Sequence, residues 1–160
     1  MALRTLRTID DDILRKVSKP VEEINEKTHQ LLEDMLETMY HENGVGLAAV
    51  QIGTLKRILV IDIGEEDPDP IEVINPRIIH NDGSQTGREG CLSIPGMSGQ
   101  VDRPMITVIK AQDRHGKEFE LQAEGRLAVV LNHELDHLDG ILYIDKAVDI
   151  QERDDKNNEE

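Results

Sequence analysis

The sequence predicts an α+β fold in which antiparallel sheets surround a C-terminal helix, with one further helix near the N-terminus. Two helix-like segments lie towards the ends of the chain, and the strand-like segments are gathered between them. Helices and strands that are segregated in this way favour α+β over alternating α/β units. Because 160 residues fit one domain, we expect residues 1–150 to form a single domain and residues 151–160 to form an acidic, disordered tail.

The first predicted helix follows a loop-rich arm of about 23 residues. Lys19-Pro20 disfavours a helix across this arm, because proline lacks an N–H and restricts the residue before it. Asn25 is a suitable N-cap, and Asn43-Gly44 ends the helix. Between these points the apolar residues recur at helical spacing and form one stripe: Leu31, Leu32, Met35, Leu36, Met39 and Tyr40.

Short apolar runs predict strands in the middle of the chain. The expected strands are residues 57–63, 71–75, 77–80, 105–111 and 118–123. Pro76 separates the second run from the third, because proline cannot donate a hydrogen bond within a sheet. We expect a hairpin-like turn at 113–116, a glycine-containing loop at 87–100 and a short strand-like segment at 141–144.

The second predicted helix carries the pattern H-E-L-D-H from His133 to His137. Residues four apart share one face of a helix, so both imidazoles can reach one metal ion while Glu134 lies beside them. This is the H-E-x-x-H arrangement of metal-dependent hydrolases. The preceding residues 126–131 are mostly apolar, and Gly140 suits the left-handed position that ends a helix. The alternative is a surface helix whose histidines are solvated or satisfied within the fold.

Two histidines do not complete such a site, because catalytic zinc-like sites take three protein ligands and leave a fourth position for water. The metzincin pattern H-E-x-x-H-x-x-G-x-x-H fails at Tyr143, and the only glutamates far enough downstream, Glu159 and Glu160, lie in the acidic end. A lone cysteine is more often a buried, inert thiol, but a thiolate also binds zinc and ferrous iron strongly. We therefore expect a site with three metal ligands: Cys91, His133 and His137. Three further histidines have no partner at ligand spacing and are expected to carry no chemistry: His29, His41 and His115.

The composition excludes several classes of partner. Acidic residues outnumber basic ones by 33 to 18, and a net charge of −15 without a basic cluster repels a phosphate backbone. No apolar run approaches the roughly 18 residues that span a bilayer. A single cysteine excludes an internal disulfide, and no N-terminal run resembles a signal peptide. We therefore expect a cytoplasmic protein that binds neither nucleic acid nor membrane.

Three segments together resemble the signature motifs of the peptide deformylase family. They are G-V-G-L-A-A-V-Q at 44–51, E-G-C-L-S at 89–93 and H-E-L-D-H at 133–137. The resemblance runs from about residue 3 to about residue 146. Within it, E-G-C-L-S resembles the corresponding motif of the type 1, bacterial-like branch of the family. It implies one catalytic domain that removes the formyl group from the N-terminal formyl-methionine of nascent polypeptides and releases formate.

The motifs suit that reaction. A divalent metal beside Cys91 lowers the pKa of bound water towards neutrality. Glu134 is placed to take the proton of that water and to pass it to the departing amine. By analogy with the family, the backbone N–H of Leu92 and the side-chain amide of Gln51 stabilise the negative charge on the formyl oxygen.

Four residues are expected to bind the substrate. The resemblance implies that Val45-Gly46 receives the peptide as an added strand, main chain to main chain. The resemblance further implies a methionine pocket lined by Val45, Val129, Val130 and the ring of His133. Val129 and Val130 lie about one helical turn before His133, so helical geometry alone places them near the metal. The alternative for both valines is a place in the plain core.

An ion pair between Glu89 and Arg103 is expected to steady the segment that carries Cys91. The resemblance implies ferrous iron as the metal in the cell, with nickel, cobalt or zinc as substitutes, and a Cys-His-His site accepts all four. Two alternative functions fit the same residues. One is an H-E-x-x-H metallopeptidase. The other is a non-catalytic metal-binding protein in which a protein side chain fills the fourth ligand position of the metal.

Two departures from the family pattern concern partners. Some bacterial members carry an arginine in the loop after Pro95, where this chain has Met97-Ser98-Gly99, so peptide preference beyond methionine does not follow from the motifs. Some members end in a long basic helix proposed to dock on the ribosome. This chain has an acidic end, so we do not expect ribosome association by that route.

Overall fold

The computed structural model describes residues 2–64 and 70–152, and its fold is α+β, as the sequence predicts. Helix α1 spans Glu26–His41 and helix α2 spans Arg126–Leu138. The strands within these residues are β1 (Gly46–Ala48), β2 (Ile58–Ile61), β3 (Ile71–Asp82), β4 (Gln85–Cys91), β5 (Ile94–Arg103), β6 (Ile106–Gln112), β7 (Glu118–Glu124) and β8 (Val148–Glu152). Short 3₁₀ turns lie at Asp12–Arg15, Ala49–Ile52 and Tyr143–Asp145.

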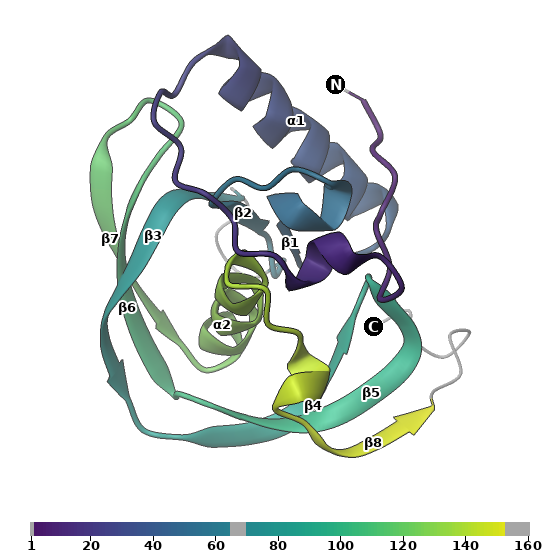
Figure 1. Ribbon diagram of the computed structural model, residues 1–160. Coiled ribbons are helices and arrows are strands. Elements are labelled where there is room, and N and C mark those ends of the chain that lie inside the picture. The colour runs from purple at the N-terminus through teal and green to yellow at the C-terminus, as the bar shows by residue number, and fades with distance from the viewer. Residues whose placement is uncertain (1, 65–69, 153–160) are drawn as a thin grey trace.

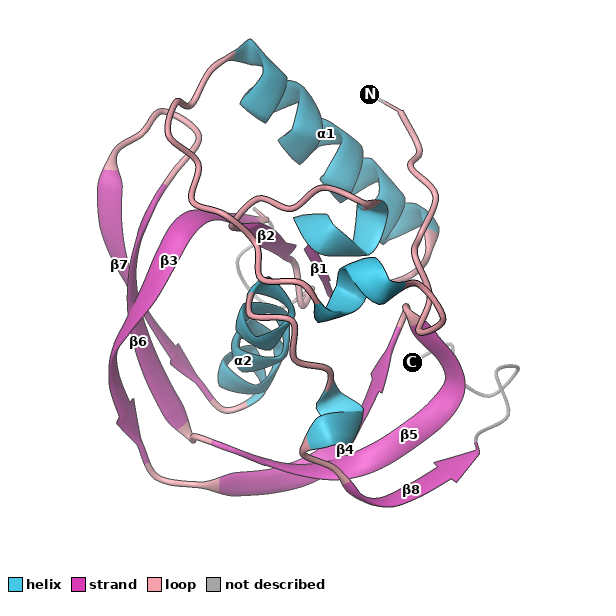
Figure 2. Cartoon of the chain, viewed as in Figure 1, coloured by secondary structure: helices cyan, strands magenta, loops and turns pink. Residues whose placement is uncertain are grey.

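The strands form two sheets around α2. One has five strands in the order β1-β2-β3-β6-β7 and the other has three in the order β4-β5-β8, and all pairs of neighbours are antiparallel. Figure 1 shows α2 enclosed by the two sheets, with α1 beyond β1 and β2. The same view coloured by element type shows that loops and short turns close the remaining side of α2 (Figure 2). The expected central position of the second helix is therefore confirmed.

β2 is buried on both faces because a helix covers each of them. Ile58 and Val60 belong to the apolar cluster under α1, whereas Leu59 and Ile61 belong to the larger cluster around α2. Successive side chains of a strand point to opposite faces, so the uninterrupted apolar run supplies both clusters at once. This strand thus connects the packing of α1 to the packing of α2.

The start of α1 agrees with the sequence. The side chain of Asn25 accepts hydrogen bonds from the N–H groups of Lys27 and Thr28, and the Thr28 hydroxyl accepts one from the N–H of Asn25. This capping box satisfies N–H groups that the first turn of a helix leaves free. The apolar stripe of α1 then packs with residues of β1 and β2, except for Tyr40, which was expected in the stripe but is 49% exposed.

The division of strand β3 at Pro76 was wrong. β3 runs continuously through the proline, and its register with β6 shifts between Ile74 and Arg77. Asn75 has φ 54°, and its side-chain amide accepts from the N–H of Val21 and donates to the Val21 carbonyl. A bulge is where a sheet tolerates proline, and the asparagine holds this bulge against the N-terminal arm.

Three other expectations also need correction. Residues 87–100 are not a loop, because β4 and β5 occupy most of this range and pair along it. Residues 141–144 are not a strand: the chain is extended only up to the 3₁₀ turn that begins at Tyr143. β8 reaches Glu152 and so includes the first two residues of the expected tail; residues 153–160 lie outside the described residues. None of the helices in the described ranges is long and apolar enough to cross a membrane.

Candidate metal centre

Cys91, His133 and His137 meet in the interior of the protein. Their ligand atoms all lie within 4.8 Å of one another, and all three residues are buried. His133 and His137 come from one face of α2, and Cys91 is the last residue of β4, not part of a loop. Sγ of Cys91 lies 3.4 Å from Nε2 of His137. The cluster is therefore the three-residue set expected from the sequence.

His133 is held from both sides. Its Nδ1 lies 2.9 Å from Oε1 of Glu89, which leaves Nε2 for a ligand. The ring of Tyr143 stacks on the His133 ring, with centroids 5.9 Å apart. By contrast, Nδ1 of His137 is buried without a hydrogen-bond partner among the described residues. A carboxylate that orients the second nitrogen of a histidine is a usual feature of metal sites.

The expected ion pair between Glu89 and Arg103 is present and buried. Nε and Nη2 of Arg103 each donate to one carboxylate oxygen of Glu89 at 2.8 Å. Burial raises the pKa of Glu89, but hydrogen bonds from Arg103 and His133 outweigh it and lower this pKa to about 2. The Glu89 side chain is therefore an anion, and it keeps its two partners in place.

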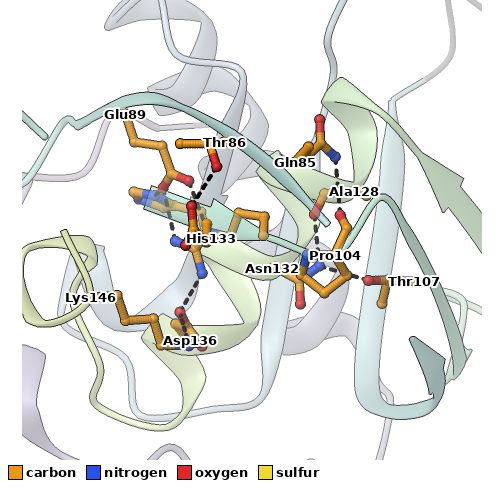
Figure 3. Close-up of polar contacts among 12 residues, drawn as sticks. Gln85, Thr86, Glu89, Pro104, Thr107, Ala128, Asn132, His133, Asp136 and Lys146 are labelled. Carbon is orange, nitrogen blue, oxygen red and sulfur yellow. Dashed lines mark hydrogen bonds and ion pairs between the residues drawn. The ribbon is translucent and has the colours of Figure 1, made fainter. Parts of the chain in front are cut away.

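Arg103 has a further partner that the sequence analysis did not identify. Its Nη1 donates to Oδ2 of Asp136 at 2.7 Å, and Nζ of Lys146 lies 3.0 Å from the same oxygen. Figure 3 shows Asp136 beside Lys146, while Asn132 contacts Thr107 and Ala128 elsewhere on the helix. The only hint of this contact in the sequence is that the H-E-L-D-H pattern contains a charged residue, Asp136.

The cluster suits a cation. Burial lowers the pKa of His133, but Cys91 and Glu89 raise it well above its ordinary value, whereas burial lowers the pKa of His137 well below it. A Cys-His-His donor set with Nδ1 of one histidine already engaged has the chemistry of a divalent metal site.

Glu134 lies beside the cluster, and one oxygen of its carboxylate is not engaged by any other described residue. The residue is buried, and its Oε1 has no hydrogen-bond partner among the described residues. Burial raises the pKa of Glu134 to about 7. Gly46 faces this carboxylate, since a Cβ atom on Gly46 would lie 2.7 Å from Oε2 of Glu134. Such a carboxylate can exchange a proton near neutral pH.

Gln51 and Leu92 also reach the cluster. Gln51 is buried in a 3₁₀ turn, and its Nε2 lies 3.6 Å from Sγ of Cys91. Leu92 follows Cys91 in the two-residue turn between β4 and β5, where Cys91 pairs with Ile94. The two groups expected to stabilise the formyl oxygen are therefore next to Cys91: Gln51 by contact and Leu92 by sequence.

The expected substrate residues are only partly gathered at the centre. Cγ1 of Val130 lies 3.0 Å from the position of a Cβ on Gly46, so these two residues adjoin Glu134. Val45 precedes β1 and is half-buried against the core. Val129 is half-buried on α2.

The three other histidines considered in the sequence lie away from the centre. Nε2 of His29 contacts the carbonyl of Arg114 on the hairpin between β6 and β7. His41 and His115 are exposed.

Sequence comparisons identify the family. Residues 3–153 match the family model described as polypeptide deformylase. A peptide deformylase of Caldicellulosiruptor bescii is 56% identical over 148 residues, which is 92% of this chain and 87% of the relative. A peptide deformylase of Thermoanaerobacter pseudethanolicus is 52% identical over 156 residues, which is 98% of this chain and 96% of the relative.

Solved structures agree. A peptide deformylase from Legionella pneumophila matches with a TM-score of 0.89 and 44% identity over 92% of this chain and 88% of the other. A peptide deformylase from Thermotoga maritima matches with a TM-score of 0.88 and 40% identity over 92% of this chain and 99% of the other. The chain belongs to the polypeptide deformylase family, and it is a metal-dependent hydrolase that removes the N-formyl group from nascent polypeptides.

Proposed function

We propose that Cys91, His133 and His137 hold the divalent metal of this hydrolase and that the metal in the cell is Fe²⁺. The buried thiol and imidazoles within 4.8 Å of one another support this assignment. One thiolate and two imidazoles suit ferrous iron and equally Zn²⁺, Ni²⁺ or Co²⁺, so these three are the substitutes. The metal, when bound, supplies Lewis acidity towards the formyl oxygen and the attacking water.

Glu134 is the proton carrier of the reaction. Its carboxylate accepts the proton of the water that attacks the formyl carbon. It then gives this proton to the amine nitrogen as the C–N bond breaks, so formate and a free amino terminus leave. Its raised pKa of about 7 supports this role, because a group that both takes and returns a proton works best near the ambient pH.

Gln51 and Leu92 stabilise the charge that develops on the formyl oxygen. Attack of water turns the planar carbonyl into a tetrahedral centre whose oxygen carries negative charge. Donors fixed before the reaction stabilise that charge without reorganising. The side-chain amide of Gln51, 3.6 Å from Sγ of Cys91, and the N–H of Leu92 are the donors.

The peptide binds along Val45 and Gly46 as an added strand, and the methionine side chain lies against Val129 and Val130. Main-chain pairing of this kind tolerates many peptide sequences. The contact between Gly46 and Val130 supports a shared binding surface. The formylated amine carries no charge, so the site needs no carboxylate for an ammonium group.

Residues 1–150 act as one catalytic domain, and the protein works in the cytoplasm on nascent formyl-methionyl chains. The acidic excess of 33 to 18 supports a role without direct nucleic-acid binding.

The observation that carries this proposal is the buried Cys91-His133-His137 cluster with Glu134 beside it. The test is formate release from a formyl-Met peptide by protein loaded with Fe²⁺ under exclusion of oxygen, then with Zn²⁺, Ni²⁺ and Co²⁺. We expect formate release without cleavage of internal peptide bonds. Cleavage of an unformylated peptide at an internal bond would instead support the metallopeptidase alternative.

A further inference from the structure

The carboxamide of Gln51 has one orientation that satisfies its neighbours. Its Oε1 accepts a hydrogen bond from the backbone N–H of Ala48 at 2.9 Å. Since that N–H can only donate, the amide oxygen must face Ala48 and the NH₂ group must face the opposite way. There Nε2 donates to Oγ of Ser93 at 3.1 Å and lies 3.6 Å from Sγ of Cys91.

Ser93 is the second residue of the turn that contains Leu92. It is fully buried, although it sits in a two-residue turn between paired residues Cys91 and Ile94. The first residue of this turn offers a backbone N–H to the site, and the second offers a hydroxyl to the carboxamide of Gln51. One short turn therefore contains one of the two groups proposed to act on the formyl oxygen, Leu92, and contacts the other, Gln51.

The N-terminal arm holds the main chains of these two segments together. The N–H of Arg7 donates to the carbonyl of Gln51 at 2.7 Å, and the N–H of Ile9 donates to the carbonyl of Ser93 at 3.0 Å. With both backbones held by the arm, the rotation of the Gln51 side chain depends on its own hydrogen bonds. The N–H of Ala48 holds the amide oxygen, and the hydroxyl of Ser93, at 3.1 Å, is the nearer of the two side-chain acceptors that hold Nε2.

We propose that Ser93 is a positioning residue that acts through Gln51. Its hydroxyl takes one proton of the Gln51 amide, and the second proton then points to the side of Cys91, where the formyl oxygen is bound. The inference rests on the proposed role of Gln51 as a donor to that oxygen. It assigns the serine of the E-G-C-L-S motif a task separate from the metal ligand two residues before it.

The first test is the kinetics of Ser93→Ala on a formyl-Met peptide. Loss of a whole donor to the oxygen costs about 10²- to 10³-fold in kcat, so loss of its alignment is expected to cost about tenfold, with KM unchanged. Ser18→Ala is the matched control, because Ser18 is also buried and its hydroxyl has no hydrogen-bond partner among the described residues. The control is expected to keep full kcat. An unchanged kcat in Ser93→Ala overturns the inference.

A double-mutant cycle separates positioning from a general structural role. If Ser93 acts through Gln51, then Ser93→Ala introduced into Gln51→Ala changes kcat by less than about twofold, because the two residues share one interaction. The same loss in both backgrounds overturns the inference and leaves the role of Gln51 intact. Full kcat in Gln51→Ala overturns the proposed role of Gln51 as well, so the two failures are distinguishable.

The second readout does not depend on activity. In the zinc-loaded protein, the side-chain amide protons of Gln51 give an NMR signal that Gln51→Ala identifies by its loss. We expect Ser93→Ala to move this signal and to speed the exchange of its protons with water, because a hydrogen-bonded acceptor is lost. Ser18→Ala is expected to leave it in place. A signal that is unmoved in Ser93→Ala overturns the inference.

Discussion

Nδ1 of His133 lies 2.9 Å from Oε1 of Glu89, whereas Nδ1 of His137 is buried without a hydrogen-bond partner among the described residues. The two histidines of one motif are thus held differently: a carboxylate of strand β4 orients the first, whereas the ring of the second contacts Cys91 and His133. Glu89 is in turn held by Arg103 through two hydrogen bonds of 2.8 Å. The orientation of His133 consequently depends on an arginine from β5.

Arg103→Ala is expected to weaken metal retention. Without the guanidinium, Glu89 is free to turn away from His133, and loss of such outer contacts typically costs about 10- to 100-fold in metal affinity. The measurement is the metal content that remains after dialysis against graded concentrations of a chelator. Arg88→Ala is the matched control, because Arg88 lies on β4 and forms an exposed ion pair with Asp149.

Arg103→Ala also leaves the buried carboxylate of Glu89 without the guanidinium that compensates its charge, which is strongly destabilising. If the variant does not fold, Glu89→Gln tests the same point, because it keeps the shape and removes the charge. We expect weaker metal retention there too. Wild-type retention in both variants would contradict a role of the ion pair in metal binding.

Glu134→Gln is expected to keep the metal and lose most of the formate release. The amide has the shape of the carboxylate but cannot accept and return a proton, and proton transfer by such a group contributes about 10²- to 10⁴-fold. Metal content by elemental analysis and kcat on a formyl-Met peptide are the two measurements. A variant with normal metal content and substantial activity would show that another group moves the proton.

The helical half of the site could be predicted from the sequence because its geometry is local. His133 and His137 are four residues apart on a helix whose period fixes their common face, and the structure places them there. Asn25 could likewise be assigned as a cap from its position before an apolar stripe. In both cases neighbouring residues contain all the information.

The sheet half depends on contacts between distant residues. β4 has the polar sequence Q-T-G-R-E-G-C and lacks an apolar alternation, so its pairing with β5 leaves little trace in its side chains. Arg103 meets Asp136 across 33 positions, and Gln51 meets Ser93 across 42 positions. No spacing rule connects residues so far apart. These partners follow only from the way the segment β4–β5 packs against α2 and against the 3₁₀ turn at Ala49–Ile52.

At pH values above the ordinary pKa of an aspartate, Asp34 is expected to stabilise the fold, and this stabilisation is expected to be lost in acid. Burial raises its pKa, but hydrogen bonds from Gln30, Arg4 and the N–H of Ala2 outweigh it and lower the pKa. Wild type should therefore be more stable than Asp34→Asn near neutrality, and the difference should shrink as pH falls below about 4. The free energy of unfolding in urea, measured at a series of pH values, tests this. The control is Asp82→Asn, because Asp82 is exposed. A difference between wild type and Asp34→Asn that is equal at every pH would contradict the prediction.

Gly46→Ala is expected to lower activity by displacing Glu134. A Cβ at this position would lie 2.7 Å from Oε2 of Glu134 and 3.0 Å from Cγ1 of Val130, so the carboxylate must move. A misplacement near 1 Å costs on the order of 10²-fold in rate, and kcat on a formyl-Met peptide measures it. Gly87→Ala on β4 is the control, because a Cβ there meets nothing within 4 Å. If both variants keep full kcat, the close approach of Gly46 to Glu134 has no role in the reaction.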